Sequence, residues 1–352
     1  MMGFCFPQLL FILLYLFSSP ANLSAPAIKK EASLMTPFAP GNKINGASIV
    51  GSSSPMDESE FNRLDSLHVN YVCLLPFAFV EEGKPKVYYN TGFQWWGERP
   101  EGIASCIRMA HAHGMQVMVK PQLWVSHGKF TGELTFKSEA EWKQFEESYS
   151  SYLFQLLEVA DSLHAEYFCL GTELNYFVRA RSSYWSLLID AARKRYSGQL
   201  TYAENWDCYE DFPYWNKVDA IGVNAYFPLS DSSTPPVEEL LNKWDPHFQK
   251  MKSLATKTGK QILFTEYGYR SIDYAAQRPW ESYTDGIMNL QAQQNGYEAL
   301  FEKFWQEPWM AGGFFWKWFD AHTDADIPVN LDFTPQEKPA IKVIQQWYSK
   351  HQ

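Results

Sequence analysis

The chain has 352 residues, of which 46% are hydrophobic and 20% charged, and this composition excludes collagen-like and disordered classes. The net charge is −10, and no run of Lys and Arg is present that could neutralise a phosphate backbone, so no nucleic-acid partner is expected. Aromatic residues reach 17%, and flat amphipathic rings in this number favour stacking on sugars.

Residues 1–27 predict a secretory signal peptide. An apolar stretch from Leu9 to Phe17 is followed by small residues that end in Ala25-Pro26-Ala27, which is similar to a signal-peptidase site. The stretch is too short to cross a hydrocarbon core of roughly 30 Å, so no membrane span is expected. We therefore expect a secreted or periplasmic protein in which residues 28–42 lead into one catalytic domain, 43–352.

Strand-like and helix-like segments alternate along this domain. Strands are predicted at 44–50, 69–80, 115–125, 167–174, 200–206, 219–227, 261–267 and 312–318. The helices that follow them are predicted at 57–68, 100–113, 138–164, 184–196, 213–217, 237–258, 287–306 and 335–350. Eight such units predict an α/β fold, a single (β/α)8 TIM barrel. A doubly wound sheet is disfavoured, because Gly51–Pro55 after the first strand lacks the GxGxxG spacing.

Two glutamates lie at the ends of predicted strands in nearly the same setting, Glu173 in the fourth strand and Glu266 in the seventh. The strands of a TIM barrel place their carboxyl ends at one mouth, so we expect the two side chains to face each other there. Cleavage of a glycosidic bond needs such a pair, with one carboxyl protonated and the other ionised. Either glutamate alone is more often a salt-bridged or rim carboxylate, whereas the two together favour a glycosidase.

Four sequence motifs at these strand ends resemble those of glycoside hydrolase family 113, a clan A family whose characterised members are β-mannanases. They are GTELN at 171–175, IGVNAYFP at 221–228, TEYGYRS at 265–271 and FFWKW at 314–318. The similarity in order and spacing covers the chain from about residue 43 to the end.

The resemblance implies a retaining double displacement with Glu173 as acid/base and Glu266 as nucleophile. It also implies Tyr226 near the nucleophile and Trp316 as the platform for a sugar ring. Thr172 departs from the pattern, because most clan A enzymes have Asn immediately before the acid/base.

The hydrogen bond that this Asn usually gives to the sugar 2-hydroxyl is instead expected from Asn224 or Asn205. Asn205-Trp206 ends the fifth strand, and Trp206 joins the predicted sugar contacts. Glu204 is the rival carboxylate on that strand, but neighbouring residues of a strand face opposite ways, so only one of Glu204 and Asn205 can face inward.

Further contacts to the sugar are predicted for Trp95, Trp96, Lys120, Gln122, Trp124 and Arg270. Trp95 and Trp96 are borne on a loop, whereas Trp124 is explained equally well by the hydrophobic core. Lys120 and Gln122 have the same parity on the third strand, so both can point toward the mouth. Arg270 either contacts substrate or locks its loop through a carboxylate pair.

Neither a cofactor nor a metal is expected. The cysteines form no CxxC pair and no zinc spacing, and Asp320, Asp324 and Asp326 fit no EF-hand loop.

The favoured interpretation is a monomeric endo-β-1,4-mannanase that cleaves a neutral β-linked polysaccharide or oligosaccharide. The alternatives are a β-glycosidase of different sugar specificity, a carbohydrate-binding barrel without turnover, and a lyase or aldolase barrel that uses Lys120 or Lys317 as a Schiff base.

Overall fold

The computed structural model describes residues 43–282, 285–320 and 329–351. The expected signal peptide, 1–27, and lead-in, 28–42, lie outside these ranges. Within them, no helix is both long and apolar enough to cross a membrane.

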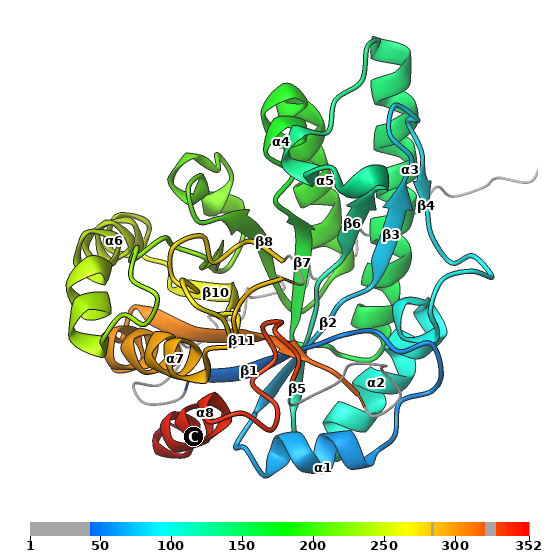
Figure 1. Cartoon of the computed structure of the whole chain (residues 1–352). Helices are drawn as coiled ribbons and strands as arrows, with labels where there is room; N and C mark the ends of the chain where they lie inside the picture. The colour runs from blue at the N-terminus through cyan, green and yellow to red at the C-terminus, as the bar shows by residue number, and fades with distance from the viewer. Residues whose placement is uncertain (1–42, 283–284, 321–328, 352) are drawn as a thin grey trace, which may run out of the picture. The chain divides into compact units, whose positions relative to one another are not determined.

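Eight parallel strands close into a barrel (Figure 1). They are β1 (Ile44–Ile49), β2 (Tyr71–Leu74), β5 (Gln116–Val119), β7 (Tyr167–Thr172), β8 (Gln199–Asn205), β9 (Ile221–Asn224), β10 (Ile262–Tyr267) and β11 (Met310–Trp318). The last strand pairs with the first, with Ile44 opposite Gly312 and Ile49 opposite Trp318. The predicted (β/α)8 TIM barrel is confirmed.

Helices cover the outside of the barrel (Figure 1). They are α1 (Ser59–Asp65), α2 (Pro100–Ala112), α3 (Glu139–Ser162), α5 (Ser182–Arg195), α6 (Val237–Thr258), α7 (Leu290–Phe304) and α8 (Ala340–Lys350). The short helix α4 (Asn175–Ala180) lies beyond the carboxyl end of β7 instead (Figure 1). The capping box predicted to open α3 is present, because the Ser138 hydroxyl accepts from the Glu141 N–H while the Glu141 carboxylate accepts from the Ser138 N–H.

Two details of the predicted elements are wrong. The segment 213–217 contains only a short 3-10 turn, Trp215–Lys217, because so short a segment cannot offset the cost of nucleating an α-helix. The small helix α4, which follows Glu173 directly, was not predicted.

Two predicted strands are each broken in two. Segment 69–80 forms β2 and then β3 (Phe77–Val80), and segment 115–125 forms β5 and then β6 (Gln122–Val125). Pro76 and Pro121 lie at the breaks, and proline has no N–H to continue a ladder. With β4 (Val87–Tyr88), β3 and β6 form a separate small sheet beyond the carboxyl ends of β2 and β5 (Figure 1).

The barrel wall is packed tightly where β9 meets β8. A Cβ atom placed on Gly222 would lie 2.1 Å from the carbonyl oxygen of Tyr202, which is backbone and cannot move aside. Close approach of these two strands therefore requires glycine at position 222.

We expect Gly222→Ala to lower the free energy of unfolding by at least about 1–3 kcal/mol, as overpacking in a rigid core does. Urea denaturation followed by tryptophan fluorescence measures this. Gly92→Ala is the matched control, because no atom lies within 4 Å of its added methyl group. Equal unfolding midpoints for the two variants would contradict the packing argument.

Candidate active site

A pocket of about 200 Å³ at the carboxyl ends of the strands contains both glutamates singled out in the sequence. Glu173 follows β7, Glu266 lies on β10, and Trp316 lies on β11. The other lining residues are Gln122, Leu123, Thr131, Thr172, Asn224, Tyr226, Trp280, Ser282 and Phe333.

Hydrogen-bond donors from three side chains surround the Glu266 carboxylate. The Lys120 ammonium and the Gln122 amide, at 3.3 Å, donate to Oε1, and the Tyr226 hydroxyl donates to Oε2 at 2.8 Å. Both oxygens are thereby satisfied, and one of the donors brings a positive charge. The shared parity predicted for Lys120 and Gln122 does bring both side chains to this carboxylate.

Lys120 is fully buried and forms an ion pair with Glu266. Burial alone would lower the pKa of Lys120, but the Glu266 carboxylate raises it, and the net change is upward. A protonated amine is not a nucleophile, so the Schiff-base alternative loses its support at this lysine. Lys317, the other candidate, pairs with Asp332 at 2.8 Å.

Glu173 has no cation as its hydrogen-bond partner, and its pKa is raised to about 7. Burial is the larger cause and the negative charge of Glu266 is the second, whereas a hydrogen bond from Asn224 lowers the pKa. That bond runs from Asn224 Nδ2 to Glu173 Oε1 at 2.8 Å. One carboxyl of the pocket is thus able to hold its proton near neutral pH while the other is paired with a lysine.

The position of the Glu173 side chain depends on an uncommon backbone conformation. Its φ of 52° lies in the left-handed region, which residues other than glycine seldom adopt. Two hydrogen bonds to β8 hold it, from the Glu173 N–H to the Ala203 carbonyl at 2.8 Å and from the Leu174 N–H to the Tyr202 hydroxyl at 2.7 Å. The neighbouring strand therefore fixes where this carboxyl points.

Asn224 is oriented by a second hydrogen bond, in which the Thr265 hydroxyl donates to its Oδ1 at 2.9 Å. This contact leaves the Nδ2 group facing Glu173. Thr172, the departure from the clan A pattern, lines the pocket and donates its hydroxyl to the Pro121 carbonyl at 3.3 Å.

Glu204, the rival carboxylate, lies outside the pocket. It is buried and accepts a hydrogen bond from Asn175 Nδ2 at 2.5 Å, and burial raises its pKa to about 7. The neighbouring Asn205 uses its Oδ1 to accept from the Trp206 N–H, so it too is absent from the pocket lining. The structure thus places neither Glu204 nor Asn205 in the pocket lining.

The predicted aromatic contacts fall in different places. Trp316 lines the pocket, whereas Trp206 reaches it only through Trp280, on which it stacks with a centroid distance of 5.4 Å. Trp96 is half-buried and packs against the core. Trp95 and Trp124 line a separate groove.

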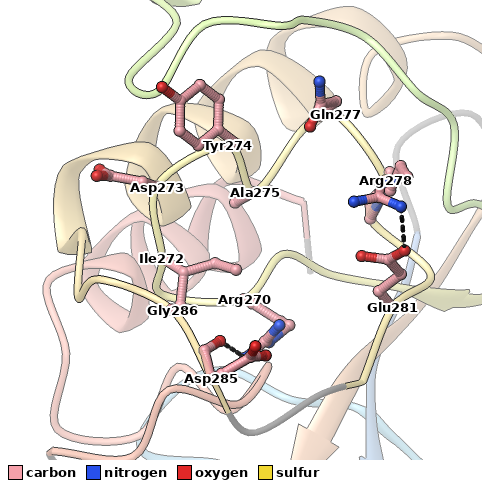
Figure 2. Close-up of a pocket in the computed structure, with 11 residues that line it drawn as sticks. Arg270, Ile272, Asp273, Tyr274, Ala275, Gln277, Arg278, Glu281, Asp285 and Gly286 are labelled. Atoms are coloured by element: carbon pink, nitrogen blue, oxygen red, sulfur yellow. Dashed lines mark hydrogen bonds and ion pairs between the residues drawn. The ribbon is translucent and has the colours of Figure 1, made fainter.

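Arg270 lies in another pocket, formed by the loop after β10 (Figure 2). Its guanidinium donates to the carbonyls of Asp285 at 2.7 Å and Leu331 at 3.3 Å. Arg270 was expected either to contact substrate or to lock its loop through a carboxylate pair. The structure shows a contact that locks the loop, but its partners are backbone carbonyls and not a carboxylate. An ion pair between Arg278 and Glu281 at 2.8 Å ties the same loop, which carries Trp280 and Ser282 to the active pocket.

Trp280, Ser282, Thr131 and Phe333 were not identified from the sequence, since three of them lie on loops and Thr131 begins a short 3-10 helix, Thr131–Glu133, all without a strand-end motif. Within residues 43–282, 285–320 and 329–351, no group of three or more His, Cys, Asp or Glu side chains is arranged to hold a metal ion. Asp324 and Asp326 of the acidic loop lie outside these ranges.

A closed (β/α)8 barrel with two coupled carboxyls at its mouth is the arrangement used by glycoside hydrolases. The chain belongs to glycoside hydrolase family 113, whose sequence model matches residues 52–338. It is therefore a glycoside hydrolase. No curated protein sequence matches it.

Solved structures show the same similarity. The family 113 β-mannanase AaManA from Alicyclobacillus acidocaldarius, in complex with ManMIm, is 25% identical with a TM-score of 0.77, over 88% of this chain and 98% of that one. A second family 113 β-1,4-mannanase is 24% identical with a TM-score of 0.76, over 88% and 99%. A β-glucuronidase from Faecalibacterium prausnitzii, 13% identical with a TM-score of 0.59, over 88% of this chain and 49% of that one, shares the fold alone.

The pKa of Glu173 is expected to fall from about 7 in Glu266→Gln, because that variant removes the nearby negative charge and leaves Lys120 unpaired. Carbon-13 NMR titration of labelled glutamate carboxyls measures the shift, with Glu173→Gln identifying the resonance. Glu98→Gln, a change outside the pocket, is the control and should leave the pKa unchanged. An unchanged pKa in Glu266→Gln would refute the coupling.

Proposed function

We propose that this glycoside hydrolase is a retaining endo-β-1,4-mannanase with Glu173 as acid/base and Glu266 as nucleophile. The observation that carries the proposal is the difference between the two carboxyls. Glu173 has its pKa raised to about 7, whereas Glu266 is held by an ammonium, an amide and a phenol. Opposite protonation states are what an acid and a nucleophile need in the same pocket.

The reaction then proceeds in two displacements. In the first, a Glu266 oxygen attacks the anomeric carbon while Glu173 gives its proton to the departing glycosidic oxygen, and a glycosyl-enzyme ester forms. In the second, the Glu173 carboxylate takes a proton from water as that water attacks the anomeric carbon. The ester bond to Glu266 breaks, and the sugar leaves with its original anomeric configuration.

The surrounding side chains support these steps. Tyr226, Lys120 and Gln122 orient the nucleophile, and Trp316 offers its ring to the sugar. Asn224 is proposed to donate to the sugar 2-hydroxyl, because an amide has two N–H donors and the hydrogen bond to Glu173 uses one of them.

The choice of mannan rests on the two family 113 mannanases, which are 24–25% identical to this chain. The net charge of −10 favours a neutral polysaccharide over an anionic one. The apolar stretch before residue 27 supports a secreted or periplasmic enzyme, which acts as a monomer on polymer outside the cytoplasm.

Variants of the two glutamates test the mechanism. Glu173→Ala should lose about 10²–10⁴-fold in kcat, the range for general acid–base catalysis, and Glu266→Ala at least as much. Added azide should restore turnover in both variants, because the anion fits the space left by the removed carboxylate. Glu266→Ala should then form an α-glycosyl azide and Glu173→Ala a β-glycosyl azide. Proton NMR of the products distinguishes these anomers.

Hydrolysis rates of the unaltered protein on mannan, glucomannan, cellulose and xylan decide which polysaccharide is the substrate. Faster hydrolysis of cellulose or xylan than of mannan would assign a different sugar specificity. Binding without turnover of any of these glycans by the unaltered protein would support a carbohydrate-binding barrel. A first product of inverted configuration would contradict the double displacement.

The pH dependence follows from Glu173. Since it acts first as an acid, kcat/KM is expected to fall as the pH rises through about 7 and the proton is lost. In Asn224→Ala this limb should move to higher pH, because the hydrogen bond that lowers the pKa is removed. A dinitrophenyl β-mannoside, whose leaving group needs no proton, is the control substrate. A flat mannan profile through pH 7 would refute the assignment.

A further inference from the structure

One face of the small sheet continues the active pocket outward. Gln122, which touches the nucleophile, begins β6, and Trp124 follows on the same face because side chains alternate along a strand. On β3, Phe77 pairs with Gln122 and Phe79 with Trp124. On β4, Tyr88 pairs with Phe79. These residues form a continuous row from the catalytic pocket across three strands.

The opposite face of the sheet fixes this orientation. Ala78 and Val80 of β3 and Leu123 and Val125 of β6 are all buried in the main hydrophobic core. A slip of one residue would place these four side chains in water, so the pairing is strongly specified. The aromatic face is thus held outward by the core beneath it.

A groove of about 960 Å³ is lined by four residues of this row, Phe77, Phe79, Tyr88 and Trp124, and also by Phe93 and Trp95. Trp124 is 60% exposed and Phe93 is fully exposed. Aromatic rings gathered in this way on a soluble protein mark a binding surface. The lining residues include one carboxylate, Glu98, and no Lys or Arg.

We propose that this aromatic face binds the polysaccharide chain beyond the sugar ring that is cleaved. The proposal rests on the proposed function and deepens it. The occupant is a neutral β-linked glycan, because aromatic rings stack on the apolar faces of sugars and the one charged residue among those that line the groove is a carboxylate, Glu98. The Lys86 ammonium beside the groove already lies over the Tyr88 ring, 5.0 Å from its centroid. Continuity through Gln122 and Phe77 gives the chain a path from the catalytic pocket to the groove.

Binding of remote sugar rings makes the enzyme selective for length. Contacts far from the reacting bond contribute binding energy that a short substrate does not have. The aromatic face therefore favours attack within long chains over attack on disaccharide-sized substrates.

The test compares Trp124→Ala and Phe79→Ala on mannan and on an aryl β-mannobioside. The ratio of kcat/KM for mannan to kcat/KM for the mannobioside should fall about tenfold in each variant, the factor expected for loss of one ring contact. Leu187→Ala, an exposed apolar residue on α5, is the matched control with an unchanged ratio. Thermal unfolding checks that each variant is folded.

A binding measurement separates this proposal from the proposed function. Calorimetric titration of mannohexaose into Glu266→Gln should show affinity that falls about tenfold when Trp124→Ala is added. If the unaltered protein hydrolyses no glycan but Trp124→Ala still weakens mannohexaose binding, the proposal for the groove is supported and the proposed function is refuted.

Three results would overturn the proposal for the groove. The first is an unchanged ratio and affinity in both variants. The second is an equal loss on mannan and on the mannobioside, which would place the effect in the catalytic pocket. The third is conversion of a dimer to a monomer by Trp124→Ala without any effect on glycans, which would assign the face to a second copy of the chain.

Discussion

The ion pair between Lys120 and Glu266 sets the chemistry of the whole pocket. Two carboxyls close together in a buried site cannot both ionise without a large cost, so their surroundings must decide which keeps its proton. The positive charge of Lys120 is fixed beside Glu266, because Lys120 is fully buried and donates a hydrogen bond to that carboxylate. Glu173 has the neutral amide of Asn224 as its hydrogen-bond partner, and its proton is correspondingly harder to remove.

This charge balance exists only because the barrel closes. Lys120 and Glu266 are 146 residues apart in the sequence and come from opposite parts of the strand order, just after β5 and on β10. Hydrogen bonds between strand ends then fix the remaining geometry, since Thr265 orients Asn224 and Asn224 contacts Glu173. A change in the register of one strand would therefore disturb both carboxyls.

The sequence predicts the parts of this site that the barrel itself determines. Buried parallel strands leave continuous apolar runs, and the barrel rule places the residues after those runs at one mouth, so Glu173 and Glu266 could be chosen without coordinates. Trp280 and Phe333 could not, because their positions depend on loops whose conformation has no periodic pattern. Arg270 illustrates the same limit, since its loop carbonyl partners, on Asp285 and Leu331, have no side-chain signature.

The breaks at Pro76 and Pro121 escaped prediction for a related reason, and they connect the chemistry to the surface beyond it. Both sides of each break are rich in apolar residues, so the hydrophobic pattern alone predicts one long strand. The chain nevertheless keeps its alignment across the break, because the Lys120 N–H donates to the Leu74 carbonyl and the Gln122 N–H to the Pro76 carbonyl. The segment that carries Lys120 to Glu266 thus continues directly into the strand that carries Trp124. A barrel strand ended at Lys120 would supply the charge but no rigid surface beyond it, whereas the broken strand supplies both from one stretch of backbone.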